Sequence, residues 1–224
     1  MIVESRELRD KTRVYGGRRS GGRALAALIR EAGIKADVIL AIPAGGAPVA
    51  AEVASALAIP AKAVVVRKVL YPWTTEAGFG AVSWLGDVHV DWRLAELAAL
   101  TPRQVEECIQ RALASVEERS KLYRRLLPEA IRGRAIVVDD GMATGYTMLV
   151  AVKAARKLGA SWVAAAAPAA SARAAALLAQ QADAVVAPNL RTHPIYAVAD
   201  AYRKWRDLSD VEALRALEEL GETS

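Results

Sequence analysis

The sequence predicts an α/β fold, in which a doubly wound, mostly parallel sheet has flanking helices, with a small hairpin or hood added to it. Short runs of Val, Ile and Ala alternate along the chain with amphipathic segments of helical period. The runs are continuously apolar, which is typical of parallel strands buried on both faces. Two of them, residues 38–42 and 135–138, are followed by small-residue loops and then by helices, as in βα units.

Residues 6–24 are basic and rich in glycine, and we expect a solvated leading segment there. Leu25, Leu28 and Ile29 then form one face of a short helix that ends at Gly33. The run 38–42 follows as the first core strand.

The loop after this strand consists of small residues, Pro43-Ala44-Gly45-Gly46-Ala47-Pro48, and a helix from Val49 to Leu57 comes next. Small residues let backbone N–H groups approach a ligand, and a helix N-terminus attracts anions. We interpret the loop as an anion site. A plain β-to-α turn is the alternative.

A second buried strand, residues 61–66, leads into Arg67 and Lys68. These cations are placed to meet an anion, and a solvated strand end is the alternative. The loop 70–80 is polar, aromatic and rich in glycine, which is typical of a functional loop. Residues 81–85 and 88–92 then flank a two-residue connection of hairpin type.

A long helix is predicted from Thr101, because Thr-Pro-Arg-Gln supplies an N-cap, a proline at the first helical position and a capping-box partner. Its charged face, which includes Arg111 and Arg119, is interpreted as solvated. Strands 162–166 and 184–186 flank an alanine-rich helix, 172–179, and the tail from Tyr202 to Leu220 is expected to pack on the body.

The most informative stretch is Ala135-Ile-Val-Val-Asp-Asp-Gly-Met-Ala-Thr-Gly-Tyr-Thr147. Its strand ends in Asp139 and Asp140, so both carboxylates lie at the strand's carboxyl tip. The loop behind them places Thr144 and Thr147 at a helix N-terminus, where free N–H groups and the helix dipole form an anion site. Two carboxylates repel a bare phosphate, so we expect a ligand that also carries hydroxyls or a cation.

Two other loop types are disfavoured. A dinucleotide loop needs its glycines before the helix and an acid about twenty residues later, on the next strand. Here the order is reversed. An Asp-x-Asp site of haloacid-dehalogenase type would need Thr or Val where Met142 stands.

The stretch resembles the motif of the type I phosphoribosyltransferases, which is a strand, two acids, two variable residues, a small residue, Thr, Gly, any residue and Thr. The matching residues are Asp139, Asp140, Ala143, Thr144, Gly145 and Thr147. Gly141 departs, because the family usually has a branched apolar residue there. The order of the whole chain is similar to a little-characterised branch of this family.

This resemblance implies transfer of the 5-phosphoribosyl group from 5-phosphoribosyl-1-pyrophosphate (PRPP) to a nitrogen acceptor, expected to be a nucleobase, with release of pyrophosphate. The ribose hydroxyls would lie on Asp139 and Asp140. The implied site comprises catalytic Asp139, Asp140 and Lys68; 5-phosphate contacts Ala143, Thr144, Gly145, Tyr146 and Thr147; pyrophosphate contacts Ala44, Gly45, Gly46 and Arg67; and acceptor contacts Arg191, His193 and Tyr196.

The resemblance also implies Mg²⁺, held by Asp139 and Asp140 directly or through water. The loop 70–80 would close over PRPP and keep water from the ring cation at C1. Hood and lid elements are expected from about 1–24, 70–92 and 188–205. The acid–base residue is unassigned, and Ala143, where some branches carry a third acid, is like the adenine branch.

Composition narrows the function classes. The chain has 224 residues, 54% of them hydrophobic, which fits a single domain over 1–224. A net charge of +5 suits small polyanions, and without a basic run interleaved with aromatics nucleic acid is not expected. Neither a membrane-length apolar run nor a signal peptide is visible, so we expect no membrane partner and a cytoplasmic protein. Cys108, the single cysteine, is interpreted as a core residue.

Two other functions stay open. The chain without an assignable acid–base residue is also compatible with a non-catalytic protein that binds PRPP or a nucleotide and regulates a partner. A nucleic-acid-binding protein is the third hypothesis. The sequence does not choose the acceptor, and it leaves the oligomeric state open, with a homodimer as one possibility.

Overall fold

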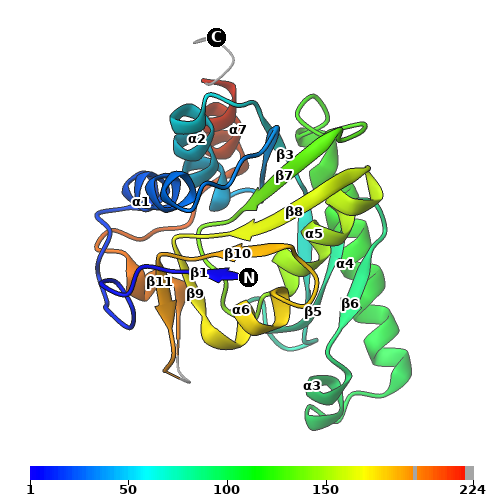
Figure 1. The fold of residues 1–224 in the computed structure, drawn as a ribbon. Helices are drawn as coiled ribbons and strands as arrows, with labels where there is room; N and C mark the ends of the chain where they lie inside the picture. Colours follow the sequence, from blue (N-terminus) through cyan, green and yellow to red (C-terminus); the bar gives the residue numbers. More distant parts are fainter. Residues whose placement is uncertain (194–195, 220–224) are drawn as a thin grey trace.

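A computed structural model describes residues 1–193 and 196–219 (Figure 1). Among these residues, six parallel strands form the central sheet, in the order β1-β10-β8-β7-β2-β3. The strands are β1 (Ile2–Val3), β2 (Val38–Ala41), β3 (Ala61–Ala63), β7 (Gly133–Val138), β8 (Ala160–Ala166) and β10 (Ala184–Val186). The predicted α/β class with a mostly parallel sheet is confirmed.

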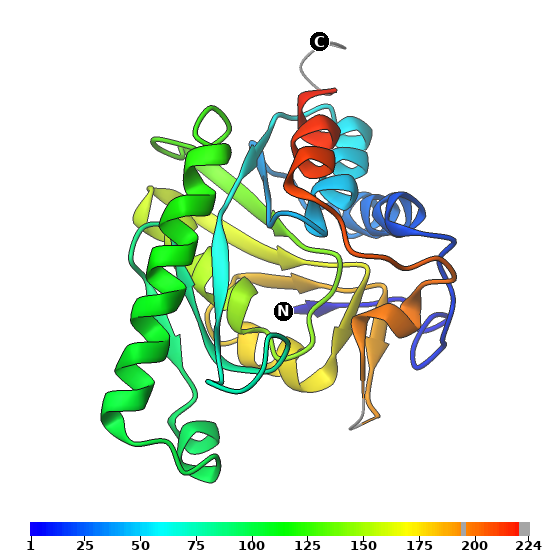
Figure 2. The ribbon, with the colours of Figure 1, turned by 180° about the vertical axis from the view of Figure 1, so that it is seen from behind.

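Helices cover both faces of this sheet (Figures 1 and 2). Alternate residues of β7 point to opposite faces, so Ile136 packs with α1, α2 and α7 in one core, while Val137 packs with α5 and α6 in the other. The helices are α1 (Arg18–Glu31), α2 (Gly46–Leu57), α5 (Tyr146–Lys157), α6 (Ala172–Leu178) and α7 (Asp210–Glu218). The last residue of the expected tail, Leu220, lies outside the described residues.

The sheet has a switch point between β2 and β7. From β2 the chain continues to β3 on one side, whereas from β7 it continues to β8 and then β10 on the other side. Because the two central strands are parallel, their carboxyl ends lie at one edge, and the loops that follow them leave the sheet side by side. Ligands bind at such points in open α/β sheets.

A separate antiparallel sheet consists of β4 (Val66–Leu70), β5 (Gly78–Ser83) and β6 (Val88–Val90). The single strand predicted over 61–66 is wrong, because β3 ends at Ala63 and β4 begins a different sheet. Arg67 and Lys68 therefore lie within a strand of the small sheet. The irregular loop is also shorter than predicted, because β5 pairs with β4 from Gly78 onward.

The next segment carries α3 (Trp92–Leu97) and α4 (Pro102–Leu122). The predicted capping box of α4 is present, since Thr101 Oγ1 accepts from the Gln104 backbone N–H and the Gln104 side chain accepts from the Thr101 N–H. Cys108, a residue of α4, is buried in the core, as predicted.

The leading segment is not solvated throughout. Its part beyond Gly17 belongs to α1 rather than to a loop, and Gly21 and Gly22 are buried there. A further small sheet joins β9 (Ala169–Ser171) to β11 (Asn189–Arg191), and a 3₁₀ helix, η1, spans Val198–Ala201. β9 pairs with β11, and η1 accepts hydrogen bonds from the backbone N–H groups of Arg13 and Tyr15. Because these partners are not neighbours in the sequence, local patterns contained little sign of the three elements.

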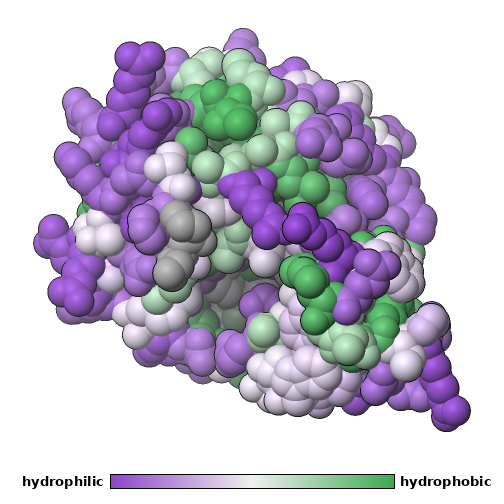
Figure 3. Space-filling view, turned by 90° about the horizontal axis from the view of Figure 1, so that it is seen from below, coloured by the Kyte–Doolittle hydropathy of each residue, from purple (hydrophilic) through white to green (hydrophobic). Residues whose placement is uncertain are grey.

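The surface shown in Figure 3 is largely hydrophilic, with hydrophobic residues in several separate patches. Over residues 1–193 and 196–219, no helix combines the length and apolar composition needed to cross a bilayer.

Candidate functional site

The acid pair follows β7 at the switch point. Asp139 Oδ1 accepts a hydrogen bond from the Asp140 backbone N–H at 2.8 Å. Burial and the neighbouring Asp140 carboxylate raise the pKa of Asp139 well above its ordinary value. Asp140 Oδ2 accepts from Arg18 Nε at 2.8 Å. The structure thus joins the pair to Arg18, a contact that the sequence did not indicate because Arg18 lies among many basic residues.

The loop behind the acids ends at Gly145, the N-cap of α5. Gly145 has a φ of +84°, which side-chain-bearing residues rarely adopt. Within the described residues Gly145 provides no side-chain cap, and the Tyr146 N–H donates to Thr144 Oγ1 at 3.5 Å. The dipole of the helix N-terminus favours an anion beside this loop. All five predicted 5-phosphate contacts line one cavity.

The loop after β2 packs directly on the acid pair. A Cβ on Gly45 would lie 2.0 Å from Asp140 Oδ2, and one on Gly46 would lie 2.7 Å from the Val138 carbonyl oxygen. A side chain at position 46 would collide with backbone, and one at position 45 would displace the Asp140 carboxylate. Of this loop, Pro43 lines the cavity, while Ala44, Gly45 and Gly46 are not among the lining residues.

Two cations line the same cavity as the acids. Arg67 and Lys68 of β4 both line the cavity. Lys68 Nζ donates to the Glu76 carbonyl oxygen at 3.4 Å. Arg67 Nε is buried and, among the described residues, has no hydrogen-bond partner. Burial, followed by the charge of Arg119, lowers the pKa of Arg67.

Helix α4 supplies two more arginines to the cavity lining, Arg111 and Arg119. The solvated interpretation is wrong for Arg119, whose side chain is only 9% exposed. The spacing of apolar residues in the sequence already indicated that Arg119 is buried. Arg119 lies three residues after Val116 and four before Tyr123, so it belongs to the buried stripe of α4.

The cavity has a volume of about 980 Å³, at the upper end of the range for small-molecule sites, roughly 300 to 1,000 Å³. It brings together the predicted catalytic residues, the 5-phosphate loop and Arg67. Other lining residues come from the turn 71–77 and from the segment 197–207, including Ala197, Val198, Ala199, Trp205 and Asp207.

Trp205 was not predicted. The Arg18 guanidinium lies 3.9 Å from the centroid of its ring. Tyr202, nearby in the chain, donates its hydroxyl to the Asp140 carbonyl oxygen at 2.6 Å. The segment after η1 therefore holds Asp140 both directly and through Arg18.

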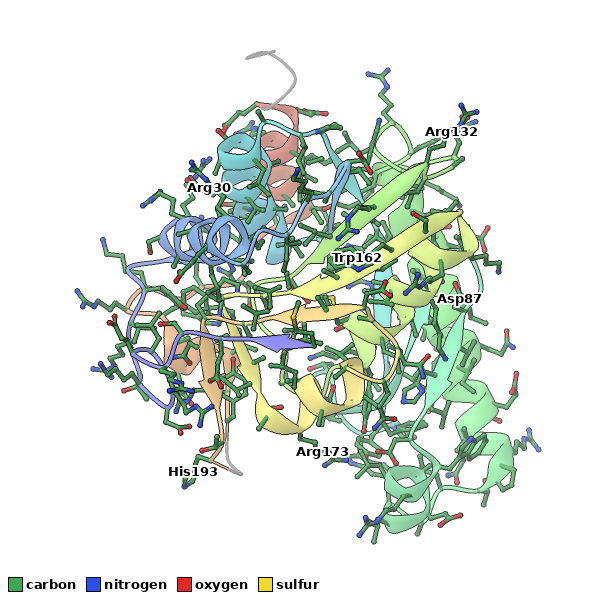
Figure 4. All side chains as sticks on the ribbon, viewed as in Figure 1. Arg30, Asp87, Arg132, Trp162, Arg173 and His193 are labelled. Atoms are coloured by element: carbon green, nitrogen blue, oxygen red, sulfur yellow. The ribbon has the colours of Figure 1, made fainter. Side chains whose placement is uncertain are left out.

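The three predicted acceptor residues do not line the cavity. Arg191 Nη1 donates to the Lys11 carbonyl oxygen at 2.9 Å, and its guanidinium lies 5.7 Å from the Tyr196 ring. Figure 4 shows His193 at the outer end of β11. Their role in acceptor binding stays a prediction. Part of their loop, residues 194–195, lies outside the described residues.

Comparisons with known proteins agree with this geometry. The family model described as phosphoribosyl transferase domain matches residues 18–199. Two Mycobacterium tuberculosis proteins, from strains H37Rv and CDC 1551 / Oshkosh and each named a "putative phosphoribosyl transferase", are 34% identical over 211 residues. These cover 92% of this chain and 47% of the relatives, so the chain spans about half of their length.

Among solved structures, TT1426 from Thermus thermophilus is similar, with 32% sequence identity and a TM-score of 0.71. The match covers 92% of this chain and 98% of that one. With its acid pair between two small-residue loops at the switch point, and with the family model matching most of its length, the chain belongs to the phosphoribosyl transferase domain family.

Proposed function

We propose that this protein transfers the 5-phosphoribosyl group from PRPP to a nitrogen acceptor, a nucleobase in the first instance, and releases pyrophosphate. Family membership supports PRPP-utilising phosphoribosyl transfer. The observation that carries the proposal is a single cavity lined by the two acids, the N-terminus of α5 and the cations of β4.

Each end of PRPP has a matching partner in this cavity. Asp139 and Asp140 would accept from the ribose hydroxyls. The loop 143–147 would hold the 5-phosphate by backbone N–H groups. Residues 43–48, called the pyrophosphate loop below, would hold the leaving group together with Arg67 and Lys68. The buried Nε of Arg67, which has no hydrogen-bond partner among the described residues, supports this assignment, because a buried N–H group without a partner is costly.

The carboxylates of Asp139 and Asp140 also fit a magnesium ion. Both line the cavity, and carboxylate oxygens are the ligands that Mg²⁺ prefers. Within the described residues, no group of three or more His, Cys, Asp or Glu side chains is suited to a metal, so the remaining ligands would be water and substrate oxygens. Bound there, Mg²⁺ would neutralise charge on the pyrophosphate.

The reaction needs no nucleophile from the protein. The bond between C1 and the pyrophosphate oxygen breaks and its electron pair leaves with the pyrophosphate. The acceptor nitrogen forms the new bond to C1 and gives up a proton. Residues of this chain would orient the two partners, and the turn 71–77, several of whose residues line the cavity, would exclude water.

A second candidate is a non-catalytic protein that binds PRPP or a nucleotide and regulates a partner. One observation favours it. Asp140, a residue assigned to the ribose, is engaged by Arg18 in an ion pair whose side chains are only 10% and 14% exposed.

Calorimetry with PRPP and Mg²⁺ tests the proposal first. We expect binding by the wild type and loss of most of it in the variant with Asp139→Asn and Asp140→Asn. A matched control, Glu107→Gln with Glu118→Gln, removes the same number of charges from exposed positions of α4 and should bind normally.

Pyrophosphate release with purines, pyrimidines and orotate then separates the two candidates. Turnover with one acceptor supports the transferase, and binding without turnover across the panel supports the regulatory protein. A wild type that fails to bind PRPP contradicts the transferase and leaves only a nucleotide as the ligand of the regulatory protein. PRPP binding that survives in the double Asn variant contradicts the site assigned to both candidates.

A further inference from the structure

Asp210, the first residue of α7, does not line the cavity but is joined to it through Arg119. Asp210 Oδ1 accepts from Arg119 Nε and Nη2 at 2.8 and 2.5 Å, and from the Tyr123 hydroxyl at 2.7 Å. A guanidinium as buried as that of Arg119 is costly without a counter-ion. Asp210 supplies this counter-ion. Because two N–H groups of Arg119 donate to it, the carboxylate also fixes the orientation of the planar guanidinium.

The remaining edge of Arg119 reaches the pyrophosphate loop. Its Nη1 donates to the carbonyl oxygen of Pro43 at 3.1 Å, and Pro43 is the residue of this loop that lines the cavity. The loop continues with Gly45 and Gly46, which have no side chains to anchor it. Arg119 therefore provides an anchor from outside the loop.

The Asp210 carboxylate also favours the charge of Arg67, the neighbouring arginine of β4. Arg67 and Arg119 lie close enough for their charges to interact. The Asp210 carboxylate is hydrogen-bonded to Arg119, whereas Arg67 Nε has no partner among the described residues. The pyrophosphate end of the cavity thus presents one guanidinium that is hydrogen-bonded to Asp210 and holds the backbone, and a second, that of Arg67, whose Nε has no hydrogen-bond partner among the described residues.

We propose that Asp210 is a positioning residue for the pyrophosphate end of the site, acting through Arg119 on the Pro43 carbonyl. The inference rests on the proposed function. It gives α7 a role in the site although this helix comes late in the chain. Figure 2 shows the segment after η1 returning across the molecule to α7. This helix packs against α2, whose first residues belong to the pyrophosphate loop.

Two ligands separate positioning from a general loss of structure. PRPP carries the pyrophosphate, and ribose 5-phosphate does not. By calorimetry with Mg²⁺, we expect Asp210→Asn to weaken PRPP binding roughly tenfold, the scale of one charge-assisted hydrogen bond, and to leave ribose 5-phosphate binding unchanged. Unchanged PRPP binding, or equal weakening of both ligands, overturns the inference.

A double-mutant cycle tests the route through Arg119. If Asp210 acts only through Arg119, then Asp210→Asn adds no further loss of PRPP affinity in an Arg119→Gln background. Additive losses overturn the inference. Arg119→Lys keeps a cation but lacks the planar fork, and it should show the same selective loss of PRPP, which covers the case in which Asp210→Asn folds poorly.

The control is Glu118→Gln, which removes a carboxylate from an exposed ion pair with Lys121 on the same helix. Both affinities should stay at wild-type values. If the wild type binds neither ligand, the proposed function fails and the inference fails with it. If the wild type binds PRPP and Asp210→Asn loses both ligands equally, only the positioning role fails.

Discussion

At the scale of single residues, the site depends on glycines, which have no side chain, as much as on residues with functional side chains. Gly45 lets the pyrophosphate loop lie against the Asp140 carboxylate, and Gly145 supplies a backbone conformation that ends the phosphate loop. The glycine-rich pattern of both loops was visible in the sequence. The need for glycine at position 45 could not be predicted, because the residue it contacts, Asp140, follows a strand far along the chain.

Gly45→Ala should abolish PRPP binding. The added Cβ would lie 2.0 Å from Asp140 Oδ2, so the loop or the carboxylate must move. Either shift moves the pyrophosphate loop away from the Asp140 carboxylate. Calorimetry with PRPP and Mg²⁺ measures the effect, and Gly16→Ala, whose Cβ would meet only Ser20 Oγ at 3.6 Å, is the control. Wild-type affinity in Gly45→Ala would show that the loop adapts and that its close packing is dispensable.

At the scale of elements, α4 shows how a charged helix can contribute to a site. Its capping box and apolar stripe were predictable from local spacing. Its contribution to the cavity could not be predicted in this way, because an arginine within an apolar stripe is buried only where another element supplies a counter-ion. That counter-ion is Asp210 of α7, and sequence periodicity carries no information on which helices meet.

The ion pair between α4 and α7 should make stability depend on pH. Burial alone would raise the pKa of Asp210, but hydrogen bonds from Arg119 and Tyr123 outweigh it and hold the pKa below its ordinary value. Such a carboxylate stabilises the fold above its unfolded pKa, about 3.9, and this contribution is lost as the pH falls through the folded pKa.

Urea unfolding of the wild type and Asp210→Asn at several pH values measures this. The difference in unfolding free energy should be about 2 kcal/mol near pH 7 and should shrink below about pH 4. A difference that stays constant down to pH 3 would mean that the carboxylate charge of Asp210 contributes nothing.

At the scale of the whole molecule, the site is a meeting point of segments that are distant in sequence. The cavity lining combines the ends of β2 and β7, the small antiparallel sheet, α4 and the segment 197–207. No single one of these elements forms the cavity lining by itself. Ligand binding should therefore stabilise the fold as a whole rather than one element.

PRPP with Mg²⁺ should raise the melting temperature. A ligand at one hundred times its Kd stabilises the folded state by about 2.7 kcal/mol, which for a chain of this size corresponds to roughly 5 to 10 °C. Differential scanning calorimetry at several PRPP concentrations checks this, with inorganic sulfate at equal ionic strength as the control. A shift that sulfate reproduces would indicate a general anion effect without recognition of the sugar.

Local sequence was enough to predict the α/β class, the core strands, the capped helix α4 and the motif from Asp139 to Thr147, because these depend on periodicity, capping and turn chemistry. Three features emerged only once the chain was folded: β4 leaves the main sheet, Arg18 binds Asp140, and Arg119 with Asp210 holds the pyrophosphate loop. The contacts behind them join residues far apart in the chain. Their geometry is set by how whole elements pack, which no local pattern records.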